Sequence, residues 1–342
     1  MSKLTPELEH FFAESQRRLD IALRAVIAPP SQPIENLDDA IAYALGLDEG
    51  APASGKRIRP ALCLLTAHCL GADTNTAMPF AAAIEIMHNF CLVHDDIEDG
   101  DEYRRGRPSV WKQFGLPHAV NTGDYLFTKI FHALLMDTKS ASVDSEKRLQ
   151  FFALMADTLD HTHRGQALDM NARGKAIGIK AYMRLVTEKT GYYLAAPLVA
   201  GAIAADAAQN TQIALRDLGL LIGPMFQIRD DLIDLTRAKG REAVGSDIRE
   251  GKRSFMAAFI CDKAPHNARA ELLSILDLPR EHTMPEHISA ALDIYEKHGA
   301  FTEAERMCSE LKRKALASLR SLPDRLRENL ETVTEYLAQR QA

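Results

Sequence analysis

Two short acidic motifs, each at the end of an apolar stretch, constrain this chain more than any other feature. The motif HDDIED occupies residues 94–99, and the motif RDDLID occupies residues 229–234. In each DDxxD the first and last aspartates stand four residues apart. A helix would carry both on one face, about one turn from each other, while the middle aspartate points aside. The pattern predicts two helices that each end in a pair of carboxylates.

The first motif belongs to a dense acidic segment that requires a cation. Six of the eight residues from Asp95 to Glu102 are acidic. Carboxylates roughly 5–6 Å apart cost on the order of 3 kcal/mol per pair at an effective dielectric near 20. Such hard oxygen ligands, with room left for water and phosphate, suit Mg²⁺ better than Zn²⁺. We therefore predict a Mg²⁺ site. Because a repulsive charge is removed, we also expect a metal-free Asp99→Ala protein to be at least as stable as the original.

A solvated surface is the alternative interpretation of one acidic helix end. Here the first motif follows apolar residues, Phe90 to Val93, and a second copy follows another apolar stretch. Basic residues complete the picture, since Arg104, Arg105 and Arg107 come directly after the first acidic segment. Arginine forks suit diphosphate oxygens, although a surface loop that balances nearby acids would look similar.

Helical spacing of apolar residues runs through nearly the whole chain, and strand-like alternation is almost absent. No linker is long or polar enough to mark a second domain. We predict one all-α domain over residues 1–342, with the motifs in a core at about 50–255 and further helices at 255–342. The helices expected in the first part of the chain cover residues 8–28, 34–47, 60 onward, 77–97, 117–136, 146–171, 179–205 and 212–236, and a polar loop is expected at 237–254.

The charge balance and the apolar runs exclude several classes of function. A net charge of −6 argues against a general binder of nucleic acid or anionic membranes. The five cysteines form no CxxC pair, as is typical of reduced thiols. The N-terminus lacks a secretory signal, and the longest uncharged run, residues 190–205, is short for a bilayer. We expect a cytoplasmic protein without an integral membrane segment.

The two acidic motifs, in the forms LVHDDIEDGDEYRRGRP (92–108) and FQIRDDLID (226–234), resemble those of the trans-isoprenyl diphosphate synthases, the polyprenyl synthetase family. Further blocks of that family occur in order: GKRIRP at 55–60, His88 seven residues before Asp95, GD at 123–124, GQALD at 165–169 and EKT at 188–190. The resemblance covers about residues 50–255.

The resemblance implies a single-domain isoprenoid-synthase-type helical bundle around a central cavity. It also implies a trans-prenyltransferase that joins isopentenyl diphosphate to an allylic diphosphate (dimethylallyl, geranyl or farnesyl) by Mg²⁺-assisted ionisation. Three Mg²⁺ ions with diphosphate bound, and a homodimer, belong to the same expectation.

The family pattern implies a role for each matched aspartate. Asp95 and Asp99 would bind Mg²⁺ on the allylic diphosphate, with Asp169 helping on the same side. Asp230 and, less directly, Asp234 would hold another Mg²⁺.

The basic and polar residues match substrate contacts of the family. Arg104, Lys189 and, from the far side, Lys252 would contact the allylic diphosphate. Thr190 and Gln227 would line the reacting carbons. The residues implied for isopentenyl diphosphate are Lys56, Arg59, His88 and Arg105. One position departs from the pattern, since Ala243 stands four residues before Asp247, where the family commonly has lysine.

Product length depends on residues below the first motif. Cys91 and Phe90 stand four and five residues before Asp95, about one helical turn away, and can act as a floor for the growing chain. Met87, one turn deeper, could narrow the tunnel further. A bulky Phe90 beside a smaller Cys91 resembles members that make geranylgeranyl diphosphate (C20), with farnesyl diphosphate (C15) as the next choice. A plain core role for Phe90 is the alternative.

Two other functions are compatible with an all-α DDxxD chain. Class I terpene cyclases usually carry an Asn/Ser/Glu metal motif on the second helix, where this chain has DDxxD, and they need no second diphosphate site. A non-catalytic subunit of a prenyl synthase would be expected to have lost one aspartate motif. Both motifs are intact here.

Overall fold

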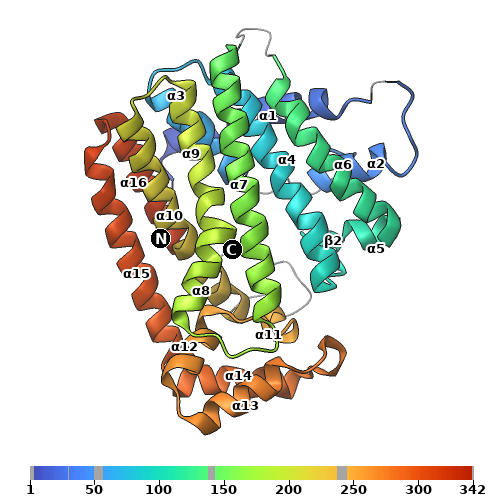
Figure 1. Ribbon diagram of the computed structural model, residues 1–342, viewed down its shortest axis with the longest axis vertical. Helices are drawn as coiled ribbons and strands as arrows, with labels where there is room; N and C mark the ends of the chain where they lie inside the picture. Colours follow the sequence, from blue (N-terminus) through green and yellow to red (C-terminus); the bar gives the residue numbers. More distant parts are fainter. Residues whose placement is uncertain (1–3, 30, 50–56, 138–142, 237–244, 341–342) are drawn as a thin grey trace.

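The computed structural model describes residues 4–29, 31–49, 57–137, 143–236 and 245–340. Helices make up about four fifths of these residues, which confirms the all-α prediction. The strands in the described ranges are the two-residue β1 (Tyr103–Arg104) and β2 (Arg107–Pro108), which pair antiparallel. In Figure 1 the long helices run roughly along the vertical axis, and α13 and α14 lie across the lower end.

The first half of the chain builds the layer that carries the first motif. Its helices are α1 (Pro6–Ile27), α2 (Asp38–Leu45), α3 (Ile58–Cys69), α4 (Thr74–Asp99), α5 (Val110–Phe114), α6 (Leu116–Leu135) and α7 (Ser145–Ala172). The helix α4 packs against α3, α6 and α9. It starts at the N-cap Asp73, whose side chain accepts the N–H of Asn75, and it ends at Gly100, whose φ of 67° lets the chain turn away directly after the motif.

The second half surrounds the helix that carries the second motif. Its elements are α8 (Ile179–Val186), the π turn η1 (Thr187–Gly191), α9 (Tyr192–Ala204), α10 (Gln209–Thr236), α11 (Ser246–Arg249), α12 (Phe255–Lys263), α13 (His266–Leu276), the 3₁₀ turn η2 (Arg280–His282), α14 (Pro285–Lys297), α15 (Ala300–Ser318), the 3₁₀ turn η3 (Leu319–Ser321) and α16 (Asp324–Gln339). The helix α10 packs mainly on α9 and α15.

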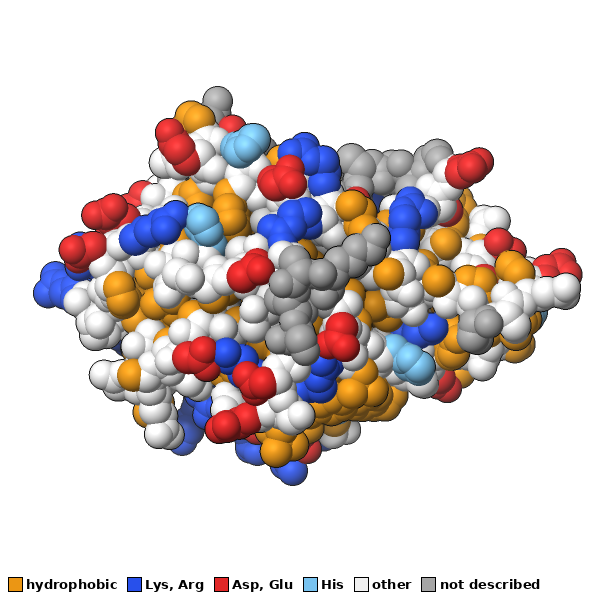
Figure 2. Space-filling view, turned by 90° about the horizontal axis from the view of Figure 1, so that it is seen from above, with side chains coloured by type: hydrophobic (Ala, Val, Ile, Leu, Met, Phe, Trp, Pro, Cys, Tyr) orange, Lys and Arg blue, Asp and Glu red, His pale blue; other side chains and the backbone are white. Residues whose placement is uncertain are grey.

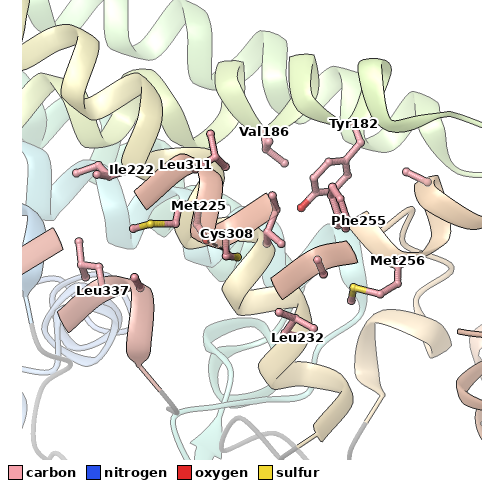
Figure 3. Close-up of a cluster of buried hydrophobic side chains, with 14 of the residues drawn as sticks. Tyr182, Val186, Ile222, Met225, Leu232, Phe255, Met256, Cys308, Leu311 and Leu337 are labelled. Carbon is pink, nitrogen blue, oxygen red and sulfur yellow. Dashed lines mark hydrogen bonds between the residues drawn. The ribbon is translucent and has the colours of Figure 1, made fainter. Parts of the chain in front are cut away.

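One buried cluster surrounds α10. Figure 3 shows Met225 of α10 beside Cys308 of α15, with Phe255 of α12 and Leu337 of α16 in the same cluster. A second buried cluster surrounds α4 and includes Phe80 and residues of α6, α7 and α9. The helix α9 supplies side chains to both clusters and so joins the two halves.

Two glycines of α10 allow its backbone to touch its neighbours. A Cβ on Gly219 would lie 2.2 Å from the Cα of Ala195, and one on Gly223 would lie 2.4 Å from the Cα of Gly191. No side chain fits at either position without moving a backbone. The second motif is therefore held at a fixed distance from α9 and η1.

Several predicted helix limits were wrong. The helix expected at 34–47 is reduced to α2, because the Asp38 side chain accepts the N–H of Ile34 at 2.6 Å and holds residues 34–37 in a turn. The helix expected from Pro60 starts at Ile58, after Arg57 in a left-handed conformation (φ 42°). The loop expected at 237–254 contains the short helix α11.

The helix expected at 179–205 is present from Ile179 to Ala204, and it contains a π turn that the sequence did not indicate. Residues Thr187–Gly191 form a π turn between α8 and α9. Such turns are rare and often lie at functional sites. This one coincides with the EKT block.

Within the described ranges, α4 is the one helix long and apolar enough to cross a bilayer, but 78% of its most apolar window is buried inside the protein. It is therefore a core helix of the bundle. On the face that Figure 2 shows, acidic and basic side chains alternate, and no continuous basic patch of the kind that binds nucleic acid is visible there.

Candidate active site

A cavity of about 530 Å³ lies between the ends of α4 and α10. A side pocket of about 70 Å³ shares Lys189, Thr190, Gln227, Asp230 and Lys252 with it. Twelve of the residues singled out from the sequence line the cavity: Arg59, His88, Phe90, Cys91, Asp95, Asp99, Arg104, Lys189, Thr190, Gln227, Asp230 and Lys252. Asp169 lines the side pocket. Lys56 and Ala243 lie outside the described residues.

The two outer aspartates of the first motif face the cavity, as their spacing predicted. Asp95 accepts a hydrogen bond from Nε2 of Gln166 on α7 at 2.9 Å. Asp99 forms ion pairs with Arg173, which follows α7, and with Nζ of Lys252 at 3.1 Å. Burial favours a raised pKa for Asp99, but the charges of Lys252 and Arg173 outweigh burial and hold this pKa well below its usual value.

The middle aspartate of the first motif has a different partner. Asp96 is 2% exposed and accepts a hydrogen bond from Nε of Arg104 at 2.7 Å. Burial raises the pKa of Asp96 to about 6, against the opposing charge of Arg104. Arg104 also approaches Asp101 at 3.4 Å. Asp96 therefore anchors the arginine hairpin that follows the motif.

The second motif presents one carboxylate to the cavity, not two. Asp230 lines the cavity and is paired with Arg340, directly after α16. Asp231 is buried, and it accepts hydrogen bonds from the Tyr182 hydroxyl at 2.7 Å and the N–H of Phe255 at 2.9 Å. It ties α10 to α8 and α12.

Asp234 does not fit the metal-ligand role expected from the sequence. It is 1% exposed, lines neither pocket, and accepts hydrogen bonds from the Ser246 hydroxyl at 2.5 Å and the N–H of Asp247 at 2.9 Å. Its carboxylate instead anchors the start of α11. The chain that follows α11 brings Lys252 to the cavity.

The π turn brings a lysine and a threonine to the cavity wall. Nζ of Lys189 lies 2.8 Å from Asp169 of α7. Although burial opposes its charge, Asp95 and Asp169 raise the pKa of Lys189 above its usual value, so it is a permanent cation. A Cβ on Gly165 would lie 2.2 Å from the backbone nitrogen of Lys189, so only glycine lets α7 approach the π turn this closely.

Thr190 and Gln227 meet at the cavity wall. The Thr190 hydroxyl donates to Oε1 of Gln227 at 3.3 Å, and Nε2 of Gln227 donates to the buried Asp231 at 3.1 Å. Because Asp231 fixes the amide nitrogen, the amide oxygen of Gln227 is turned toward Thr190. The pair offers oriented oxygen dipoles beside the cavity.

A basic group lies on the α3 side of the cavity. The guanidinium of Arg59 stacks over the ring of Tyr193 at 4.2 Å, and His88 lies beside the same ring. Burial, followed by the charges of Arg59, Arg105 and Arg104, lowers the pKa of His88 well below its usual value, so this imidazole is neutral at neutral pH. Arg105 lines a small pocket next to the cavity rather than the cavity itself.

Aromatic rings close the cavity below the first motif. The ring of Phe90 lies 5.5 Å from that of Phe127, 5.1 Å from that of His94 and 5.8 Å from that of His163. Cys91 lines the cavity as a neutral thiol, because burial and the nearby Asp95 raise its pKa to about 12. Met87 is fully buried in the α4 cluster and does not line the cavity, so its expected role in narrowing the tunnel is not supported by its position.

Sequence reasoning missed three side chains that pair with the aspartates of the site, Gln166, Arg173 and Arg340. Gln166 lies inside the GQALD block, and Arg173 follows Asp169 by four residues on one helical path, so both could have been found from spacing. Arg340 carried no signal, because it lies 110 residues from Asp230 in the sequence.

The donor set fits Mg²⁺ that arrives together with a diphosphate. Asp95, Asp99, Asp169 and Asp230 offer hard oxygen atoms from facing helices. Within the ranges that the structure describes, no three His, Cys, Asp or Glu side chains converge as a complete metal cage. Phosphate oxygens would have to supply the remaining ligands.

The ion pairs of Asp99 argue against the expectation that the metal-free protein would be at least as stable without this carboxylate. We now expect Asp99→Asn to lower the free energy of unfolding of the metal-free protein by about 1–3 kcal/mol at pH 7. The ion pairs depress the pKa of Asp99 in the folded protein. The carboxylate therefore stabilises the fold at pH values above its ordinary pKa of 3.8, and this stabilisation is lost as the pH falls through the depressed pKa of the folded state. In urea unfolding, the difference from wild type should therefore be full at pH 7 and shrink toward pH 3.

The matched control is Asp95→Asn, since Asp95 accepts its hydrogen bond from a neutral amide. It should change stability much less than Asp99→Asn. Equal stability of wild type and Asp99→Asn at pH 7 would contradict the structural role of the pairing.

Comparison with known proteins agrees with this site. Residues 44–295 match the polyprenyl synthetase family. A short chain isoprenyl diphosphate synthase of Methanothermobacter thermautotrophicus is 36% identical over 84% of this chain and 87% of its own length. A geranylfarnesyl diphosphate synthase of Aeropyrum pernix is 31% identical over 84% of this chain and 91% of its own length.

The fold is also shared with a solved structure. The geranylgeranyl pyrophosphate synthetase of Pyrococcus horikoshii superposes with a TM-score of 0.84 at 31% identity, covering 98% of this chain and 99% of its own. With a family match over most of the chain and relatives aligned along most of their length, this chain belongs to the polyprenyl synthetase family of prenyltransferases.

Proposed function

We propose that this protein is a trans-prenyltransferase that condenses isopentenyl diphosphate with a short allylic diphosphate in the presence of Mg²⁺. The observation that carries the proposal is one cavity with two separate sets of charged groups. Asp95, Asp99 and Asp230 face it from α4 and α10, and Arg59 and His88 lie on its α3 side. Two sets are what a reaction between two diphosphates requires.

The acidic side would bind the allylic diphosphate. Asp95, Asp99, Asp169 and Asp230 would hold Mg²⁺, three ions in the full complex, and the bound ions would neutralise charge on the departing diphosphate. In the ligand-free protein, Lys189 and Lys252 lie against Asp169 and Asp99. When metal takes over the carboxylates, these ammonium groups can turn to the phosphate oxygens.

The chemical step would be an ionisation. The allylic C–O bond breaks, its electron pair leaves with the diphosphate, and an allylic cation remains. The amide oxygen of Gln227 and the hydroxyl of Thr190 would stabilise that cation through their dipoles. The double bond of isopentenyl diphosphate then forms the new C–C bond, and a proton passes to the released diphosphate.

The basic side would hold isopentenyl diphosphate. Arg59 and a neutral His88 can both donate hydrogen bonds to phosphate oxygens. Arg105 and, from the resemblance, Lys56 complete this proposed set. Stacking on Tyr193 orients the Arg59 guanidinium before substrate arrives.

We propose a C20 product, geranylgeranyl diphosphate, with farnesyl diphosphate next. Phe90 and the rings that contact it close the cavity about one turn below Asp95. The smaller Cys91 leaves room beside them. The names of similar proteins include a geranylgeranyl and a geranylfarnesyl diphosphate synthase, so membership of the family does not fix the product length. We propose that the residues that close the cavity fix it.

A class I terpene cyclase and a non-catalytic subunit remain less well supported. A cyclase does not need the Arg59 and His88 set. A subunit without activity would not need Asp95, Asp99 and Asp230 all turned to the cavity.

We further propose that the chain forms one domain, since α9 packs in both buried clusters. We propose a cytoplasmic location as well. We also propose a homodimer. The helices α6 and α7 lie next to each other, as the stacked rings of Phe131 and Phe152 show, and both carry exposed apolar side chains. Among them are Leu116, Val120, Leu135 and Leu149.

Purified protein incubated with isopentenyl diphosphate, dimethylallyl diphosphate and Mg²⁺ should give longer allylic diphosphates, and chelation of the metal should stop the reaction. Asp230→Asn should lower turnover about 100-fold or more, whereas Asp217→Asn, an exposed carboxylate on the same helix, should not. Chromatography of the products provides the measurement. Failure to elongate would contradict the proposal, and a hydrocarbon product would favour the cyclase.

Phe90→Ala should shift the products toward longer chains, because it removes the floor of the cavity. The matched control is Met87→Ala, which removes a buried side chain of the same helix outside the cavity and should lower stability without changing product length. An unchanged distribution for Phe90→Ala would reject its role as the floor.

Light scattering or sedimentation should report twice the mass of one chain. Glutamate at both Val120 and Leu135 should shift the protein toward monomers, while glutamate at the exposed Ile213 of α10 should not. A monomeric wild type, or a double variant that remains dimeric, would contradict the proposed interface.

A further inference from the structure

A buried carboxylate that the proposed reaction does not use lies at the centre of the basic group. Glu85 of α4 is 3% exposed and does not line the cavity. Its Oε1 accepts a hydrogen bond from Nδ2 of Asn89 at 3.2 Å and lies 4.0 Å from Nε of Arg57. A buried acid of this kind needs compensating charge.

That charge comes from three arginines on two segments, the start of α3 and the β1–β2 turn. Burial raises the pKa of Glu85, and the positive charges of Arg57, Arg105 and Arg59, in that order, act against this rise. Conversely, burial lowers the pKa of Arg105, and Glu85 is the largest charge that supports its ionised form. Glu85 is thus the shared anion of guanidinium groups that would otherwise repel one another.

Two of these arginines adopt an unusual backbone conformation. Arg57 has a φ of 42° and Arg105 has a φ of 55°. Both therefore lie in the left-handed region of backbone conformation, which residues other than glycine rarely adopt. Arg105 and Gly106 are the central residues of the tight β1–β2 turn. The two-residue turn itself requires the positive φ of Arg105, whereas Arg57 keeps its conformation with its side chain held by buried partners.

Arg57 connects the anion to the start of α3. Its Nη1 lies 2.7 Å from Asp20 of α1, and its Nη2 donates to the carbonyl of Leu45 at 3.2 Å. It is the residue before α3, two positions from Arg59. Fixing Arg57 therefore fixes where the Arg59 guanidinium enters the cavity.

We propose that Glu85 is a positioning residue for the pocket that receives the diphosphate of isopentenyl diphosphate. It lies beside Arg57, which precedes α3 and so sets the position of Arg59, and its negative charge compensates the positive charge of Arg105 on the β1–β2 turn. It does not touch the substrate itself. This inference rests on the proposed function, since it concerns the second substrate of that reaction.

The test is Glu85→Gln, which keeps the shape of the side chain and removes its charge. The KM for isopentenyl diphosphate should rise about tenfold, with kcat and the KM for the allylic diphosphate changed by less than about threefold. If Glu85 only supported the fold, the variant would change the KM values for both substrates alike. Equal changes in both KM values, a loss of kcat alone, or no change would overturn the inference.

A double-mutant cycle with Arg105→Ala shows whether Glu85 acts through Arg105. If it does, Glu85→Gln should raise the KM for isopentenyl diphosphate less in the Arg105→Ala background than in wild type. Fully additive effects would overturn this link. If Glu85→Gln does not fold, Glu85→Asp, which keeps the charge and shifts it by one methylene, should give the same selective rise in smaller measure, and a non-selective effect would again overturn the inference.

Failure of this inference can be told apart from failure of the proposed function. A wild-type protein that does not elongate prenyl chains removes the function itself. A wild type that elongates, together with a Glu85 variant that treats both substrates alike, removes only the positioning role.

Discussion

Ion pairing between carboxylates and basic side chains around one cavity is the interaction on which the site depends. Asp99 with Arg173 and Lys252, Asp169 with Lys189, and Asp230 with Arg340 each join elements that are distant in the sequence. These cations offset the repulsion that an array of acids would otherwise suffer. The same cations can serve the phosphate oxygens once metal occupies the carboxylates. The site therefore pairs its carboxylates with cations that can exchange partners.

The two DDxxD motifs divide their aspartates between binding and structure. In the first motif, Asp95 and Asp99 face the cavity while Asp96 anchors the arginine hairpin. In the second, only Asp230 faces it, while Asp231 and Asp234 tie α10 to α8, α11 and α12. Close backbone contacts at the glycines of α10 keep this motif at a constant distance from the π turn. The two motifs share the DDxxD pattern, but their aspartates have different roles because their surroundings differ.

Local spacing made the helices and the outer carboxylates of the first motif predictable, since helical geometry alone puts Asp95 and Asp99 on one face. The role of Asp234 could not be predicted in this way, because it depends on Ser246 and Asp247 beyond an intervening segment. The ion pairs of Asp99 argue against the expectation that the apo protein would tolerate its loss, for a related reason. It counted neighbouring acids and left out cations that arrive from other helices. Arg340 reaches the site only through the path of α16, which no local pattern encodes.

Metal binding with and without a diphosphate tests the central claim most directly. Calorimetric titration of Mg²⁺ into the protein should show weak binding alone and at least about tenfold tighter binding in the presence of a non-hydrolysable allylic diphosphate analogue, because phosphate oxygens complete the coordination and take up the displaced Lys189 and Lys252. Asp95→Asn and Asp99→Asn should each remove most of this gain. Equally tight binding of Mg²⁺ with and without the analogue would contradict the account, since it would mean that the carboxylates form a complete metal site by themselves.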